Sequence, residues 1–330
     1  MATYAITGSS GYVGTRMTRW LLEREPDAKI IGFDVRPPRV ESDRLEFHRL
    51  DVRDPALADR LKGRDVASLL HFAFVLDPLY DEREMHDIDV GGTKNVLRAV
   101  VEAKVPHLLA TSSTTAYGAL PDNPSRLREE DPVRAAPAFA YAHDKRLMDD
   151  LLQAFAREHP EVKVCTIRPC IVLGPNVANY IAFNLLTQPV TTLLDGQNPE
   201  LQFIHEDDLV RLVATCLEKR AAGIYNAVGE GTLTSRDLAR LAGKRTLRVP
   251  YRAAWGLVWA LHRVRALDFA MPPGILDFFR NPWVASGDKA RRDLGFVPDH
   301  SSRACFEILL ARKDQVLADF KQRIKARGKR

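Results

Sequence analysis

Tyr141 and Lys145 are the residues whose types and spacing most directly suggest chemistry. They stand four apart in a segment that predicts a helix over residues 139–158, so both side chains lie on one face of that helix. A tyrosine hydroxyl titrates at about pH 10 in the absence of other groups. A neighbouring ammonium group stabilises the phenolate, and Lys145 would therefore let Tyr141 act as an acid or base nearer neutral pH.

A hydroxyl group follows the predicted strand at residues 107–113, in the segment Ser112-Ser113-Thr114-Thr115-Ala-Tyr117-Gly. A tyrosine and a lysine at this spacing are common by chance, but a third polar group at a strand end makes chance a poor explanation. The hydroxyl can polarise a carbonyl, or bind an alcohol while a hydride moves. The combination predicts oxidation or reduction at an alcohol or ketone.

A glycine-rich turn lies between the first predicted strand, Thr3–Thr7, and the helix that follows it. Gly8, Gly11 and Gly14 allow a tight turn and a close approach of the backbone to a pyrophosphate, which rests on the free N–H groups of the helix N-terminus. Tyr12 and Val13 belong to the same turn. Its place directly after an N-terminal strand predicts a dinucleotide site.

Asp34 ends the second predicted strand, twenty residues after Gly14. A carboxylate there accepts hydrogen bonds from the adenosine ribose and repels a 2′-phosphate, so it favours NAD over NADP. Arg36 and Arg39 lie close by and weaken this preference. Asp51 and Val52 follow the third strand, where Asp51 either binds the adenine amino group or is an ordinary surface turn residue.

Strands and helices alternate through the first half of the chain. This pattern predicts an α/β fold, a doubly wound parallel sheet of the Rossmann type with helices on both faces. A long helix is expected at residues 80–103. After residue 175 the segments become shorter, which predicts a smaller α/β substrate-binding domain over residues 176–330. A segment at about 200–230 is expected to return to the first domain, residues 1–175.

The motifs GxxGxxG, DVRD, HFAF, SSTTAYG, YAHDK, RPCIVLGP and QFIHEDDL, in this order, resemble those of the extended short-chain dehydrogenase/reductases, which include NAD-dependent nucleotide-sugar epimerases and dehydratases. The resemblance runs to about residue 310. It implies that Ser113 is the catalytic hydroxyl, Tyr141 the acid or base, and Lys145 its partner. The positions that it assigns to the dinucleotide, besides those above, are Phe72, Ala73, Phe74, Ser112, Pro169 and Cys170. The resemblance also implies a homodimer, often formed through the helix that carries the tyrosine.

The sequence departs from the family pattern on the substrate side. Thr114 and Thr115 stand where dehydratases carry an acid, which favours simple hydride chemistry: 4-epimerisation through a ketone, or plain oxidation and reduction. Ile171 replaces the asparagine that binds the diphosphate of a nucleotide sugar, and Asp89 replaces another asparagine. Residues assigned to the substrate are Val75, Thr114, Thr115, Ile171, Asn179, Gln202 and His205. His205, Asp207 and Asp208 fit a structural role, as a packing histidine and acids at a helix start, equally well.

The apolar stretch at residues 253–279 supports an alternative substrate, a hydrophobic alcohol or ketone of steroid or terpenoid type. Its residues Trp255, Leu257, Trp259 and Leu261 either line a pocket or belong to the core or a dimer contact. A second alternative, of another class, is a regulator that senses NAD without chemistry. Such proteins commonly lack the tyrosine or the lysine, and this chain has both.

Composition narrows the class of protein. Of 330 residues, 45% are hydrophobic and 28% charged, which is ordinary for a water-soluble globular protein. The last ten residues hold six basic and no acidic side chains, so the remaining 320 sum to −1, and the basic end is expected to be a solvated helix tail. Four cysteines without metal-binding spacing predict a reduced cytoplasmic protein with no metal site. We expect no signal peptide, no membrane span and no nucleic-acid partner.

Overall fold

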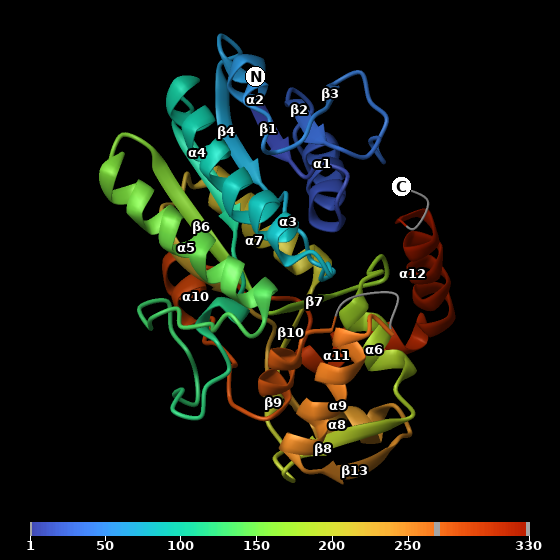
Figure 1. Ribbon diagram of the computed structural model, residues 1–330. Coiled ribbons are helices and arrows are strands. Elements are labelled where there is room, and N and C mark those ends of the chain that lie inside the picture. Colours follow the sequence, from blue (N-terminus) through green and yellow to red (C-terminus); the bar gives the residue numbers. More distant parts are fainter. Residues whose placement is uncertain (1, 267–270, 328–330) are drawn as a thin grey trace.

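The structure is a computed structural model that describes residues 2–266 and 271–327. Its centre is a parallel sheet of seven strands in the order β3-β2-β1-β4-β5-β6-β11 (Figure 1). The strands are β1 (Thr3–Thr7), β2 (Lys29–Asp34), β3 (Leu45–Arg49), β4 (Val66–His71), β5 (His107–Thr111), β6 (Lys163–Pro169) and β11 (Gly223–Ala227). The order reverses direction between β1 and β4, and ligands bind at such a switch point in open α/β sheets.

Helices cover both faces of the sheet (Figure 1). One apolar core contains Met17 and Leu21 of α1 (Tyr12–Arg24) with Leu209 of α7 (Glu206–Glu218). The other contains residues of α2 (Ala56–Leu61), α4 (Gly92–Glu102) and α5 (Ala140–Glu158). Central strands such as β5 are buried on both sides, which explains why they are apolar without alternation. The predicted doubly wound α/β fold is confirmed.

The predicted helix at residues 80–103 contains an irregular turn. The chain forms α3 (Glu82–His86), a π-helical turn at Asp87–Gly91, and then α4. Gly92 lies close to the loop after β3, since an added Cβ would be 2.4 Å from Val52 Cγ1. The Thr93 hydroxyl donates to the Asp89 carbonyl at 2.6 Å. Such π turns inside helices often occur at functional sites.

A smaller lobe lies at the lower end of the molecule in Figure 1. In it, β8 (Val190–Leu194) pairs in parallel with β13 (Arg245–Val249). Its helices are α6 (Tyr180–Thr187), α8 (Ser235–Leu241), α9 (Tyr251–Arg263) and the 3-10 segment η3 (Pro273–Phe279). The predicted boundary at residue 176 falls between β7 (Ile171–Leu173) and α6. The division into two domains stays a prediction.

Short strand pairs and the last helices join the lobe to the sheet. β7 pairs with β10 (Phe203–His205), and β9 (Glu200–Leu201) pairs with β12 (Leu233–Thr234). Between β10 and β12 the chain returns to the main sheet as β11, the edge strand beside β6. The last described helices are α10 (Asp288–Leu294), α11 (Ser302–Ala311) and α12 (Lys313–Arg327).

The basic C-terminal segment differs from the expected solvated tail. It is helical as predicted, but α12 packs against α6, and Val316 and Phe320 are buried. Arg323 forms an ion pair with Asp77 in the loop after β4. Residues 328–330 lie outside the described part of the chain. Among the residues that the structure describes, no helix is long and apolar enough to cross a membrane.

Candidate active site

A cleft of about 1010 Å³ runs along the carboxyl ends of the sheet strands. At one end it begins beside Asp34, and at the other it reaches Arg323 of α12. All of the residues that the sequence assigns to catalysis and to the dinucleotide line it: Gly8, Gly11, Tyr12, Val13, Gly14, Asp34, Asp51, Val52, Phe72, Ala73, Phe74, Ser112, Ser113, Tyr141, Lys145, Pro169 and Cys170. Four of the substrate assignments line it as well, namely Val75, Thr115, Ile171 and Asn179, and residues far apart in the sequence therefore face one space.

The glycine turn leaves no room for side chains. Gly8 has φ of +71°, and an added Cβ would lie 2.6 Å from the Ala73 nitrogen. A Cβ on Gly14 would lie 2.1 Å from the Gly8 carbonyl oxygen. No side chain caps the N-terminus of α1, and its first turn holds no acidic residue. The free backbone N–H groups there suit an anion, so this turn fits the pyrophosphate of a dinucleotide.

Asp34 is held at the edge of this turn. Its carboxylate accepts the backbone N–H of Ser10 at 3.1 Å and that of Arg36 at 2.9 Å. The Arg36 guanidinium lies beside it, with Nε 3.2 Å from Oδ1. Arg36 and Arg39 also line the cleft. A carboxylate and two guanidinium groups therefore meet where the adenosine ribose would lie.

Asp51 is already engaged in an ion pair. The Arg53 guanidinium contacts both carboxylate oxygens, at 2.9 and 2.7 Å, and lies 2.8 Å from Asp87 in the π-helical turn. Arg53 lowers the pKa of Asp51. The carboxylate is thus fixed in its ionised form at the edge of the cleft, beside Val52.

Ser113 and Tyr141 both line the cleft, and the Ser113 hydroxyl is close enough to influence the pKa of Tyr141. Ser113 begins the 3-10 turn Thr114–Tyr117, and its hydroxyl also accepts the backbone N–H and the hydroxyl of Thr115, at 3.1 and 2.9 Å. Tyr141 lies in the first turn of α5 and is 9% exposed. Burial raises the pKa of Tyr141, and the Ser113 hydroxyl opposes this shift. The phenol is therefore protonated at neutral pH in this state.

Lys145 lies one turn further along α5 and is almost completely buried. Its Nζ donates to the Thr111 carbonyl at 2.7 Å and lies 3.4 Å from the centre of the Phe74 ring. The rings of Tyr141 and Phe74 make an edge-to-face contact, with their centres 5.6 Å apart. Burial lowers the pKa of Lys145 to about 7, so the charge of this side chain responds to its surroundings near neutral pH.

Asp89 is a feature of the site to which the sequence analysis assigned no role. The π-helical turn places it inside the protein with no exposed surface. Its Oδ1 accepts the Val75 N–H at 2.7 Å, and Oδ2 has no hydrogen-bond partner among the described residues. Burial raises the pKa of Asp89, and the nearby Lys145 opposes this shift. An asparagine cannot change its charge, so the replacement adds a titratable group behind the lysine.

Glu206 is a second residue that the sequence analysis missed. It is buried at the start of α7, and its carboxylate accepts the Tyr12 hydroxyl and the Asn176 side-chain amide. Gly174 allows the approach, because an added Cβ would be 2.5 Å from the Glu206 side chain. Glu206 thereby fixes the tyrosine of the dinucleotide turn. Its position within the quoted QFIHEDDL motif was the available signal.

Three of the predicted substrate residues do not line the cleft. Thr114 is buried, and its hydroxyl donates to the Pro169 carbonyl at 3.4 Å. His205 caps α7 by accepting the Asp207 N–H at 3.2 Å, and its ring stacks on His300 at 4.0 Å. Asp208 accepts the backbone N–H groups of Asp299 and His300. The geometry of His205 and Asp208 matches the structural alternative.

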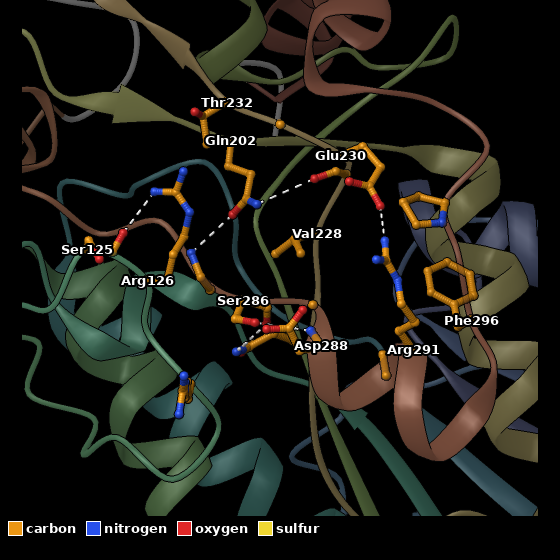
Figure 2. Close-up of a pocket in the computed structure, with 18 of the residues that line it drawn as sticks. Ser125, Arg126, Gln202, Val228, Glu230, Thr232, Ser286, Asp288, Arg291 and Phe296 are labelled. Carbon is orange, nitrogen blue, oxygen red and sulfur yellow. Dashed lines mark hydrogen bonds and ion pairs between the residues drawn. The ribbon is translucent and has the colours of Figure 1, made fainter.

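Gln202 faces a different pocket, of about 680 Å³ (Figure 2). Figure 2 shows it near Arg126, Val228 and Glu230, with Arg291 reaching Glu230. The charged residues that line this pocket balance: Arg126, Arg128 and Arg291 against Asp131, Glu230 and Asp288. Gln202 bonds to backbone groups at Ala285 and Gly229. It supports the wall between the pocket and the sheet and has no contact with the cleft.

The apolar stretch at residues 253–279 does not line the cleft through its tryptophans. Trp255, Leu257 and Trp259 are on the surface of α9, and Leu261 is partly buried outside the cleft. Residues 267–270 lie outside the described part of the chain. Apolar side chains of other segments line the substrate end instead, among them Val75, Leu76, Ile171, Val172 and Ile181.

Comparisons with known proteins show relatives in sequence and in structure. Sequence relatives include "Short-chain dehydrogenase/reductase family 42E member 1" of Danio rerio, 27% identical over 69% of this chain and 64% of the relative. Another is the "N-acetyl-alpha-D-glucosaminyl-diphospho-ditrans,octacis-undecaprenol 4-epimerase" of Escherichia coli O157:H7, 27% identical over 71% of this chain and 69% of the relative. The solved structure of DesIV, a dTDP-glucose 4,6-dehydratase of Streptomyces venezuelae with NAD and TYD bound, superposes with a TM-score of 0.73, at 22% identity and over 95% and 97% of the two chains.

A sequence model of the "NAD dependent epimerase/dehydratase family" matches residues 4–228, which contain the glycine turn, Asp34, Ser113, Tyr141 and Lys145. The match covers most of the chain and confirms the resemblance that the motifs indicated. The protein belongs to the NAD-dependent epimerase/dehydratase family of enzymes, within the extended short-chain dehydrogenase/reductases.

Proposed function

We propose that the protein is an NAD-dependent oxidoreductase or epimerase that acts at a secondary alcohol or the corresponding ketone. The observation that carries this proposal is that Ser113, Tyr141 and Lys145 line one cleft, with Lys145 and Tyr141 packed on the ring of Phe74. Bound NAD would supply the hydride acceptor and a positive charge. Every other function in the reaction can come from side chains that line the cleft.

Each of the three residues has a separate task in the proposed mechanism. Ser113 donates a hydrogen bond to the substrate oxygen and holds it beside Tyr141. Tyr141 takes the proton of the alcohol during oxidation and returns it to the carbonyl during reduction. Lys145 in its charged form lowers the pKa of the phenol and hydrogen-bonds the ribose of the dinucleotide. Asp89 supports the charged form of Lys145.

Asp34 supports NAD as the cofactor in preference to NADP. Its carboxylate is fixed by two backbone N–H groups and would bind the ribose hydroxyls. Arg36 is the residue that would bind a 2′-phosphate. Calorimetric titration should give tighter binding of NAD than of NADP, and the Asp34→Ser variant should lose this preference. Equal binding of the two cofactors by the unaltered protein would contradict the assignment.

Two substrate classes remain within the proposal. A sugar nucleotide agrees with the family, and 4-epimerisation needs no residue beyond those present. An apolar alcohol or ketone is favoured by the apolar walls near Ile171 and Val75. The substrate named for the Escherichia coli relative joins a sugar diphosphate to an undecaprenol, and it therefore combines both properties. A homodimer is also proposed, and sedimentation of the purified protein tests it.

The first test is the dinucleotide released when purified protein that was never given NAD is denatured. An epimerase regenerates its cofactor in each cycle and retains it, whereas a dehydrogenase exchanges it in each turnover. Near-stoichiometric release supports epimerisation and directs the substrate screen to sugar nucleotides. Release of none, with weak binding of added NAD, supports a dehydrogenase and directs the screen to apolar alcohols and ketones.

The second test separates chemistry from binding. Tyr141→Phe should lower turnover by about three orders of magnitude, because it removes the proton donor and acceptor. NAD affinity should stay within about twofold, since the ring that packs on Phe74 remains. Thr114→Val, which alters a hydroxyl outside the cleft, is the matched control. A fully active Tyr141→Phe protein would remove the mechanistic assignment.

A further inference from the structure

Helix α9 presents an unusual number of large apolar side chains at the surface. Trp255 is 40% exposed, Leu257 62% and Trp259 49%, and Val264 just after the helix is 71% exposed. The helix packs on η3 through its opposite side, where Val258 is buried. No described residue lies within 4 Å of the position that a Cβ on Gly256 would occupy. Trp255 and Trp259 are about one helical turn apart and share an exposed face of α9 with Arg252 and Arg263, whereas Leu257 lies on another side of the helix.

The segment that contains this face is basic. From Leu238 to Ala266 the sequence holds seven basic residues and no acidic one. Arg245, Arg248, Arg252, Arg263 and Arg265 are all exposed. The acids nearest to the start of α9 in the structure are Asp195 and Asp277. Both are engaged: Arg280 pairs with Asp195, and Asp277 accepts the Tyr251 hydroxyl at 2.7 Å.

The end of α9 contacts the loop that lines the cleft. The ring of His262 lies 5.4 Å from that of Tyr80, and the Arg265 guanidinium is also 5.4 Å from the Tyr80 ring. Val75, Leu76 and Asp77 of the same loop line the substrate end of the cleft. The exposed face of α9 is thus next to a wall of the cleft and lies in the smaller lobe (Figure 1).

We propose that the exposed face of α9 binds the surface of an anionic lipid bilayer. The side chains of Trp255 and Trp259 enter the headgroup region, where the amphipathic indole ring is favoured, while Arg252 and Arg263 contact lipid phosphates. The helix lies in the plane of the membrane. Its long basic side chains can place their aliphatic parts against the apolar face and their charges in the headgroups.

A second copy of the chain fits this face less well. Most homodimers have a two-fold axis, which brings the same patch of both copies together. Arg252 and Arg263, which share the face of the two tryptophans, would then lie against the same arginines of the other copy. Anionic phosphates complement these arginines, and the headgroup region accepts the indole rings. The charge therefore selects the lipid surface as the occupant.

Vesicle co-sedimentation of the full-length protein tests the proposal. Vesicles of equimolar phosphatidylglycerol and phosphatidylcholine should bind the protein at least about tenfold better than vesicles of phosphatidylcholine alone. Added salt should weaken binding to the anionic vesicles because it screens the arginines. Equal binding to both kinds of vesicle, or binding to neither, would overturn the proposal.

Two sets of variants locate the contact. The double variant Trp255→Ser, Trp259→Ser and the triple variant Arg252→Gln, Arg263→Gln, Arg265→Gln should each lower binding to anionic vesicles about tenfold or more. The matched control is Val297→Ser, which changes an apolar side chain 47% exposed outside α9. NAD affinity, measured by titration, reports that each variant is folded, because α9 does not line the cleft. Unchanged binding in both variants would contradict the assignment to α9.

Tryptophan fluorescence separates the lipid surface from a protein contact. Trp283 is buried and Trp20 of α1 is partly buried outside α9, so the change in emission that the double variant loses reports on the two tryptophans of α9. Brominated lipids should quench the emission, and the double tryptophan variant should lose this quenching. If instead the unaltered protein sediments as a dimer that the double variant dissociates, the face is a contact between copies and the proposal fails.

Discussion

The two ends of the cleft are built in different ways. The dinucleotide end is local: β1, the glycine turn and α1 are consecutive, and Asp34 ends the neighbouring strand. The substrate end combines the loop after β4, the segment from Ile171 to Ile181, and α12 at the end of the chain. A short stretch with a fixed geometry can be recognised from its residues. A wall made of segments more than 90 residues apart cannot be recognised in this way, which is why the cofactor is better defined than the substrate.

The largest expected effect is at the dinucleotide end. Gly14→Val places a side chain where a Cβ would lie 2.1 Å from the Gly8 carbonyl oxygen, so the turn must move. NAD affinity measured by calorimetry should fall at least about a hundredfold. Gly256→Ala, at a helical glycine with open space around it, is the control and should bind NAD normally. Normal binding by Gly14→Val would show that the turn does not hold the dinucleotide.

A smaller effect is expected at the substrate end, where Arg323 and Asp77 join α12 to the loop after β4. Once a substrate is known, Arg323→Gln and Asp77→Asn should each raise its KM about fivefold and leave NAD affinity unchanged. The double variant should be no worse than either single one, because both remove the same contact. Lys321→Gln on the same helix is the control. Additive effects would show that the two residues act separately.

The pH dependence of stability tests the burial of Lys145 between the two ends. The pKa of Lys145 is about 7 in the folded protein and 10.5 when the side chain is free. Below pH 7 both states are protonated, and the folded protein bears the full cost of a buried charge. Between these values the unfolded state holds the extra proton, so stability rises with pH. The free energy of unfolding increases by about 1.4 kcal/mol for each unit of difference between the two pKa values.

Lys145→Met removes this dependence. Thermal unfolding should show the variant more stable than the unaltered protein below pH 7, and the difference should shrink as the pH approaches 10.5. Lys94→Met, at an exposed lysine, should show no such trend. If the stability of Lys145→Met relative to the unaltered protein instead increased with pH, Lys145 would be a favourable cation in the folded state, in a strong pair with Asp89.

The smallest effect on activity is expected for Gln202, which lies in the second pocket (Figure 2). Gln202→Ala should leave kcat, KM and NAD affinity within about twofold, because the side chain does not reach the cleft. It should lower the free energy of unfolding by about 1–2 kcal/mol, since the Ala285 N–H loses its acceptor. A large loss of activity at unchanged stability would restore Gln202 as a substrate residue.

The sequence was sufficient for the sheet, its helices and the residues that line the dinucleotide end, because alternation and glycine placement are local signals. Asp89 shows the limit. Its buried position depends on a π-helical turn, and one extra residue in a turn leaves the hydrophobic period almost unchanged. The contacts of Glu206 and Arg323 could not be predicted either, because their partners Tyr12 and Asp77 are about 200 residues away or more in the sequence. The tryptophans of α9 were ambiguous because apolar residues at helical spacing fit a core or a surface equally.

The return of the chain as β11 affects how the protein is made. During synthesis the strand that becomes the edge of the sheet, β11, emerges only after the first part of the smaller lobe. Until then β6 is an open edge, although its residues from Val164 to Ile167 are buried in the finished protein. Open apolar edges invite pairing between nascent chains. A fragment that ends at residue 175 should therefore aggregate, whereas one that extends through residue 227 has the strand that closes the edge.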